Sequence, residues 1–149
     1  MSEQLTLNPR QRHDLRAIAA MIVPPSEEYR VPGADDDLIQ ADILATLGRD
    51  TKPVVAALDH LARLAGMPLA ELAPDARDGV GQEFRKHGGA AAATLVRVVL
   101  QCYYRDDRVL RSLGLEPRAP FPKGHVLPDG DWSLLDPVKA RGGTLRRAP

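Results

Sequence analysis

The C-terminal third of the chain combines frequent prolines with large apolar side chains. Between Leu115 and Val138 the prolines are Pro117, Pro120, Pro122, Pro128 and Pro137. Each proline fixes φ and removes a backbone donor, so the sequence predicts no helix or central strand through this stretch. A solvated tail is expected to be polar, yet this one carries Phe121, Val126, Leu127, Trp132, Leu134, Leu135 and Val138. These side chains need a surface to cover them, on the chain's own domain or on another protein.

Before this stretch, apolar residues recur at helical spacing. Asn8 and Pro9 form a cap and first-turn pair, and Pro24 ends the helix that they begin. Three consecutive aspartates at 35–37 supply a cap and favourable charge for a second helix. Thr51 is expected to cap a third helix, which Gly66 closes.

The next segments differ in the strength of their helical pattern. Residues 68–85 support only helical pieces, and a break is expected at Pro74, Gly79 and Gly81. Glycines 88 and 89 separate this segment from residues 90–104, whose polar side chains share one narrow face. A helix that is apolar on most of its circumference belongs at the centre of a bundle. We therefore expect the folding centre around Val96, Val99 and Leu100.

A last short helix, capped by Asp106 or Asp107 and closed by Gly114, completes the pattern. No strand alternation and no internal repeat is found in the sequence. The predicted fold is therefore all-α: a small helical bundle over residues 1–114, followed by an extended proline-rich C-terminal arm over residues 115–149 that docks on a partner.

Charge and cysteine content exclude several functional classes. The 149 residues include 20 Lys plus Arg and 20 Asp plus Glu, so the formal net charge is zero. A nucleic-acid-binding protein usually shows a basic excess or stripe, which is missing here. Cys102 is the only cysteine, so neither an intrachain disulfide nor a cysteine-rich structural zinc site can form. A near-neutral chain tends to associate, which favours a permanent partner.

The location of the protein is predicted from its first residues and its apolar runs. Residues 1–9 lack a basic region followed by an apolar core, which argues against a conventional signal peptide. The longest apolar run, residues 90–100, is interrupted by Thr94 and Arg97 and is too short to span a bilayer. We expect no direct membrane insertion and a cytoplasmic protein, or a periplasmic one only if a partner exports it.

Motifs of catalysis are scarce. No phosphate-binding loop, nucleophile elbow or two-histidine metal helix is present in the sequence. Cys102, on the apolar helix, is expected to be a small buried hydrophobe, and the aspartates at 35–37 a helix cap. The histidines are scattered over four segments, at His13, His60, His87 and His125. The sequence thus predicts no catalytic, cofactor-binding or metal-binding residue on this chain.

Partner binding is the strongest signal. Phe121 lies between two prolines and forms a stiff aromatic anchor, and tryptophan, found here at Trp132, is enriched in interface hot spots. The adjacent tyrosines Tyr103 and Tyr104 point about 100° apart on a helix, so one can face the core and the other a neighbouring surface. The predicted partner-binding residues are Tyr104, Phe121, Lys123, His125, Trp132, Leu134 and Leu135. The alternative is that Phe121 and Trp132 cover their own bundle.

Several short motifs resemble the gluconate 2-dehydrogenase subunit 3 family. These are the small subunits that accompany flavin-dependent sugar and alcohol dehydrogenases of the glucose-methanol-choline (GMC) oxidoreductase type. The motifs are Leu7-Asn8-Pro9, Leu15 to Val23 followed by Pro24, Val31-Pro32-Gly33-Ala34, Tyr103-Tyr104-Arg105-Asp106 and Leu113-Gly114-Leu115. The similarity covers roughly residues 5 to 115 and leaves the arm unmatched.

The resemblance implies a non-catalytic accessory subunit in a heteromeric oxidoreductase complex. It would hold no cofactor itself and would support maturation and stability of a large GMC-type flavoprotein, whose FAD oxidises a sugar or another alcohol. The runner-up is a free-standing helical binding or regulatory protein. A third possibility is a small enzyme that uses His125, Asp129 or Asp131 as acid-base groups, which would require a cleft and tuned pKa values.

Overall fold

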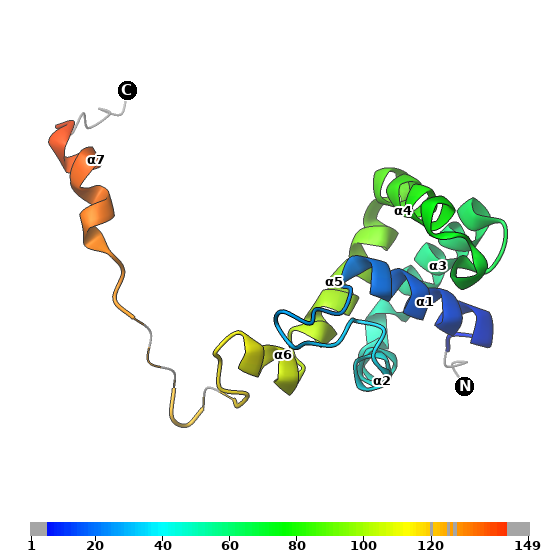
Figure 1. Cartoon of the computed structure of the whole chain (residues 1–149), viewed down its shortest axis with the longest axis horizontal. Coiled ribbons are helices and arrows are strands. Elements are labelled where there is room, and N and C mark those ends of the chain that lie inside the picture. Colours follow the sequence, from blue (N-terminus) through cyan, green and yellow to red (C-terminus); the bar gives the residue numbers. More distant parts are fainter. Residues whose placement is uncertain (1–5, 120, 125, 127, 143–149) are drawn as a thin grey trace. The chain divides into compact units, whose positions relative to one another are not determined.

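The computed structural model describes residues 6–119, 121–124, 126 and 128–142. The chain divides into two compact units, Met1–Pro117 and Arg118–Pro149. The helices of the first unit are α1 (Pro9–Ile22), α2 (Asp37–Thr46), α3 (Thr51–Ala65), α4 (Pro74–His87), α5 (Gly89–Tyr103) and α6 (Asp107–Ser112), with the short 3-10 helices η1 (Gly48–Asp50) and η2 (Leu69–Glu71) between them (Figure 1). The described residues contain no β-strand, so the all-α prediction is confirmed for them.

The ends of α1 and α2 follow the predicted cap chemistry. Asn8 and Gln11 form a reciprocal capping box, with N–H···O distances of 2.9 and 3.0 Å, and Pro9 begins α1. Asp36 caps α2 by accepting from the Leu38 N–H at 3.0 Å. Gly66 closes α3 at a φ of 69°, the left-handed conformation that glycine tolerates best. These three predictions are confirmed.

Two helix predictions were wrong in detail. Thr51 is the first residue of α3 and does not cap it, because its hydroxyl donates to the Gly48 carbonyl at 2.7 Å. The expected break at Gly79 and Gly81 is also missing, since α4 runs unbroken from Pro74 to His87. A Cβ atom at Gly81 would lie 2.7 Å from Cε of Met21. This glycine therefore allows α1 to approach α4 closely rather than ending the helix.

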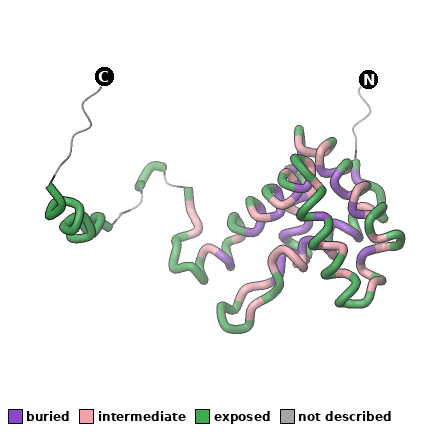
Figure 2. The backbone as a smooth tube through the Cα atoms, turned by 90° about the horizontal axis from the view of Figure 1, so that it is seen from above, coloured by how far each residue is buried: buried purple, intermediate pink, exposed green. Residues whose placement is uncertain are grey.

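The core is organised around α3, which contacts α1, α4 and α5. Its buried side chains are Val54, Ala57, Leu58 and Leu61, and Figure 2 shows the buried positions concentrated inside the first unit. The helix α5 packs against α3, α2 and α1 through Ala92, Leu95, Val98, Val99, Cys102 and Tyr103. Val96 and Leu100 are only half-buried. Val99 thus lies in the core and Val96 and Leu100 at its edge, and whether this part of α5 is the folding centre stays a prediction that denaturation can test.

Two buried polar side chains attach loops to the helices. The Asp14 side chain on α1 is 1% exposed and accepts from the Leu69 N–H at 2.9 Å, which holds η2 against the core. Gln40 on α2 donates to the Ala34 carbonyl at 2.8 Å. Both polar groups gain a partner inside the protein, so their burial does not leave an unsatisfied hydrogen-bonding group.

One arginine joins two helix starts. Asp36 caps α2 and Asp106 caps α6, and the Arg108 guanidinium donates to both carboxylates, at 2.7 and 2.9 Å. Hydrogen bonds from Arg108 lower the pKa of Asp36 and of Asp106, outweighing the opposing effect of burial. The carboxylates raise the pKa of Arg108 in turn. The two caps and the arginine thus stabilise each other.

The second unit contains η3 (Trp132–Leu135) and α7 (Asp136–Ala140). Asp131 caps η3 by accepting from the Ser133 N–H at 3.0 Å, and Pro137 lies in the first turn of α7, where a proline is tolerated. The expectation of no helix through residues 115–138 therefore needs correction at its end. Among the described residues, no helix is both long and apolar enough to cross a membrane.

We expect Leu95→Ala and Leu100→Ala to differ in cost. Leu95 is fully buried, so its truncation should lower the free energy of unfolding by about 2–5 kcal/mol. Leu100 is only partly buried, so its truncation should cost less, about 1 kcal/mol. Urea denaturation of both variants measures the difference. Equal losses would show that Leu100 is covered in the isolated chain.

The arginine clamp predicts a pH-dependent stability. Arg108→Met should cost about 1–2 kcal/mol near pH 7, since Arg108 is partly exposed and its hydrogen bonds are partly screened. Lowered carboxyl pKa values stabilise the fold above the ordinary value of 3.8, and this contribution is lost as the pH falls through the lowered values. The difference from wild type should therefore shrink below about pH 4.

The matched control for the clamp is Arg111→Met. Within the described part of the chain, Arg111 pairs with Asp107 alone, one turn away on the exposed side of α6, at 3.1 Å. Such pairs contribute about 0.5 kcal/mol or less. Thermal unfolding from pH 3 to pH 7 compares the two variants, and an equal loss for both would contradict the clamp.

Candidate functional site

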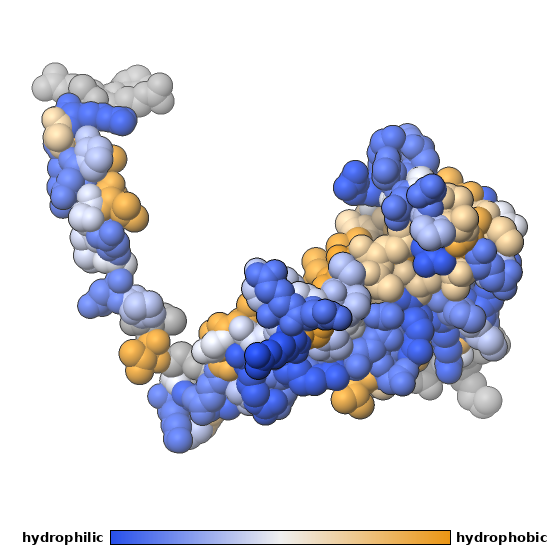
Figure 3. Space-filling model, viewed as in Figure 1, coloured by the Kyte–Doolittle hydropathy of each residue, from blue (hydrophilic) through white to orange (hydrophobic). Residues whose placement is uncertain are grey.

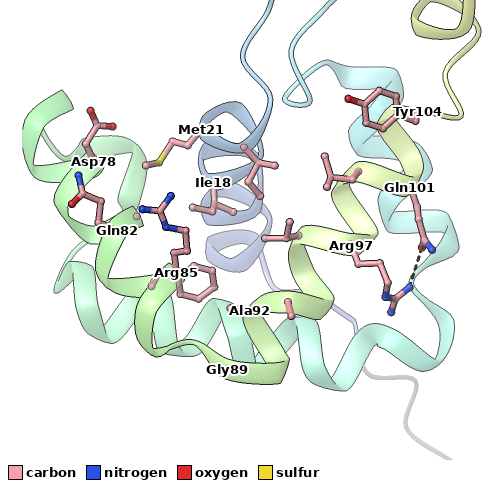
Figure 4. Close-up of a pocket in the computed structure, with 16 residues that line it drawn as sticks. Ile18, Met21, Asp78, Gln82, Arg85, Gly89, Ala92, Arg97, Gln101 and Tyr104 are labelled. Carbon is pink, nitrogen blue, oxygen red and sulfur yellow. Dashed lines mark hydrogen bonds between the residues drawn. The ribbon is translucent and has the colours of Figure 1, made fainter. Parts of the chain in front are cut away.

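The first unit has an open apolar groove of about 1160 Å³ between α1, α4 and α5. Its floor is made by apolar side chains from all three helices: Ile18, Met21, Ile22, Phe84, Ala92, Val96 and Leu100. In Figure 4, α1 lies between α4 and α5, and Ile18 and Met21 point into the space between them. Figure 3 shows the apolar surface that reaches solvent beside α1 and α5.

Polar side chains border this groove on two sides. On α4 they are Asp78, Gln82 and Arg85, and on α5 they are Arg97 and Gln101. The Arg97 guanidinium pairs with Asp50 at 2.9 Å and donates to Gln101 at 3.0 Å, so its charge is engaged (Figure 4). Arg85 has no hydrogen bond or ion pair with any other residue of the described part of the chain. An apolar floor with a polar border is the usual anatomy of a binding surface.

Tyr104 lies at one end of the groove. Its ring is 52% exposed and packs edge-on against buried Tyr103, with ring centroids 5.2 Å apart. The arrangement is the one expected for two adjacent helical tyrosines, with one in the core and one at the surface. Of the predicted partner-binding residues, only Tyr104 belongs to the first unit.

The other predicted partner-binding residues lie in the second unit. Trp132 and Leu134 belong to η3 and are 71% and 74% exposed, Leu135 is 42% exposed, and Phe121 is 87% exposed. Lys123 is also exposed. A turn of 3-10 helix followed by one of α-helix has too little surface to bury such side chains by itself. The predicted residue His125 lies outside the described residues.

Cys102 and two of the three consecutive aspartates have structural roles. Cys102 is 3% exposed, with its Sγ 3.5 Å from Thr46 Oγ1 and 3.5 Å from an Arg105 guanidinium nitrogen. Burial raises the pKa of the Cys102 thiol, which disfavours the thiolate that a nucleophile requires. Of the three aspartates, Asp36 caps α2 and Asp37 pairs with Arg16.

The remaining titratable residues do not gather into a site in the described ranges. His60 stacks near Phe84, with ring centroids 6.0 Å apart, and His87 pairs with Glu83 at 3.4 Å. Within the residues that the structure describes, no group of three or more His, Cys, Asp or Glu side chains could hold a metal ion. Hydrogen bonds from Ser133 lower the pKa of Asp131, away from the neutral range in which a general base works best.

The sequence did not predict the groove. Seven apolar or small residues of α4 and α5 line it, among them Val96 and Leu100, which were predicted to lie in the core. One signal could have found it. The α5 sequence is apolar on most of its circumference, which is more surface than the few other predicted helices can cover. Which stripe stays uncovered depends on helix packing, which the sequence pattern does not specify.

Comparisons of this chain with protein-family models, with curated proteins and with solved structures found no match. The resemblance to small subunits of flavin-dependent dehydrogenases therefore stays a prediction from the motifs of the sequence. The fold and the site define the chain as a helical protein with an apolar groove and a set of exposed apolar side chains in its second unit.

The buried environment of Cys102 predicts low thiol reactivity. In the native protein, Cys102 should react with a disulfide reagent at least about tenfold more slowly than in the urea-unfolded chain, because the thiol is inaccessible and its pKa is raised. Absorbance of the released thiolate at pH 8 follows both rates. A native rate equal to the unfolded one would contradict the burial of this side chain.

Proposed function

We propose that this chain is a non-catalytic accessory subunit of a flavin-dependent dehydrogenase of the GMC type. It binds the large flavoprotein through its second unit and supports the maturation and stability of that subunit. FAD is held by the partner, which oxidises a sugar or another alcohol. The observation that carries the proposal is the exposure of Phe121, Trp132 and Leu134 on a segment too small to bury them.

The energetic reasoning concerns the two aromatic residues. Burial of an aromatic side chain removes a large apolar area from water, worth about 25 cal/mol for each Å² covered. Phe121 and Trp132 are 87% and 71% exposed, so most of the free energy that their burial could contribute is still available for binding. Aromatic anchors of this kind account for much of the binding energy in protein interfaces. The flavoprotein as partner is supported by the family motifs of the first unit.

The runner-up is a free-standing helical binding or regulatory protein. The first unit has a contiguous core that extends from Leu7 to Val109, which is compatible with independent folding. The two functions differ in their partner. A stable monomer that never associates with a flavoprotein would favour the runner-up, and a flavin chromophore on the isolated chain would contradict the accessory function.

We expect Trp132→Ala to weaken binding of the large flavoprotein by about 2 kcal/mol or more, equivalent to roughly 30-fold in Kd. The measurement is co-expression of the two chains, co-purification and titration of the separated subunits by calorimetry. The matched control is Tyr29→Ala, which removes a similarly exposed aromatic ring, 63% against 71%, from a turn of the first unit.

Unchanged binding in Trp132→Ala and in Phe121→Ala would refute the proposed anchors. Truncation after Pro117, the end of the first unit, gives a second measurement. The helical content of the truncated chain should persist while co-purification is lost. Unfolding of the truncated chain would show instead that the first unit needs the second unit to complete its core.

A further inference from the structure

The groove is lined by one complete stripe of α5. The lining positions follow each other at alternating steps of three and one: Gly89, Ala92, Ala93, Val96, Arg97, Leu100, Gln101 and Tyr104. This is the periodicity of one helix face, repeated over the whole helix. At a rise of roughly 1.5 Å per residue, the stripe is about 22 Å long. Ala92 in this stripe is buried, but Val96 and Leu100 are only partly buried, so this face of α5 is incompletely covered by its own unit.

The opposite wall and the floor are also lined from one side of each helix. On α4 the lining positions are Asp78, Gly81, Gln82, Phe84 and Arg85, which fall within two turns of one side of the helix, and on α1 they are Ile18, Met21 and Ile22. Figure 4 shows α4 and α5 on either side of α1. Packed helices contact each other through stripes of side chains of this kind. The space between these three helix faces can therefore accommodate one further helix.

The shape of the groove favours a helix over a small molecule. Pockets for small ligands have roughly 300–1,000 Å³ and enclose most of the ligand surface. This groove measures about 1160 Å³ and is open to solvent. An amphipathic helix laid into an apolar groove buries only its apolar face and keeps its polar face in water, which suits an open site.

The charges on the border define the occupant further. Arg85 is exposed, borders the groove from α4 beside Gln82 and Met21 (Figure 4) and has no partner among the described residues. Arg97 across the groove is already paired with Asp50. Asp78 lies two turns from Arg85 on α4 and would repel an acidic residue placed at the Asp78 end of the groove. The complementary helix is therefore amphipathic, with a carboxylate opposite Arg85 rather than a uniformly acidic face.

We propose that the groove between α1, α4 and α5 is a docking site for an amphipathic α-helix of another protein, which carries an acidic side chain that pairs with Arg85. The helix completes the packing of α5 by covering Val96 and Leu100. All residues that line this site belong to the first unit, and the proposal does not require the partner to be a flavoprotein.

The test uses the full chain and three synthetic helical peptides of about 18 residues. All three carry the same leucine stripe and differ at one flanking position, which is Glu, Gln or Lys. Fluorescence anisotropy should give the tightest binding for the Glu peptide and the weakest for the Lys peptide, separated by about twofold to fivefold for each exposed charge interaction. Arg85→Glu should reverse this order, and Arg63→Glu, an exposed change on α3, should leave it unchanged.

A steric variant tests the position of the site. Ala93→Trp fills the groove from an exposed position of α5 and should weaken all three peptides at least about tenfold. The control is Ala90→Trp, an exposed position on the same helix outside the groove. Circular dichroism melts establish that both variants are folded. Equal binding by both variants would overturn the proposal.

Two other occupants of the groove are distinguishable outcomes. If the chain fills its own groove, the wild type will bind no peptide up to about 1 mM and residues 89–104 will be protected from hydrogen exchange without any peptide. If a second copy fills it, sedimentation will show a dimer that Ala93→Trp dissociates. Either result overturns the proposal. Neither decides whether a flavoprotein co-purifies, so the accessory function is tested separately.

Discussion

The packing of α3 against its neighbours is the constraint on which the first unit depends. Its buried stripe, Val54, Ala57, Leu58 and Leu61, faces α1, α4 and α5 together, so the apolar surface of one helix holds three others in place. Because α3 covers only one side of α5, the opposite stripe of α5 remains at the surface. The same packing that closes the core therefore creates the groove, and close-packed interiors leave little freedom to close it by relaxation.

Polar residues fix the connections that this packing leaves undetermined. Asp14 holds η2, Gln40 holds the segment before α2, and Arg108 ties the starts of α2 and α6 together. Each interaction joins a helix end or loop to a distant element through a specific donor and acceptor. Apolar burial alone cannot specify such positions, because it has no direction. These polar contacts thus hold η2, the segment before α2 and the start of α6 in place on the core.

The two candidate surfaces differ in physical character. The groove is preformed by long helices that are held in a packed core, so a ligand there meets a surface that is already ordered and loses less entropy on binding. The segment from Trp132 to Ala140 is far shorter than the roughly 12–15 residues at which an isolated helix becomes even marginally stable. Its exposed side chains gain most from a surface that covers them, which suits an anchoring segment better than a catalytic one.

The sequence by itself determined several helix ends of the first unit, because capping and turn residues act locally. Asn8 with Gln11, Asp36 and Gly66 mark helix ends through hydrogen bonds and φ values that involve only their neighbours. Gly81 was misread because its function is to let Met21 approach, a contact between distant parts of the chain. The candidate site divides in the same way: Tyr104 was identifiable as a surface aromatic, whereas Val96, Leu100 and Arg85 became part of a site only in three dimensions. Tertiary packing decided which side of α5 is covered, since a helix that is apolar on most of its circumference offers several equivalent faces and only its neighbours select one.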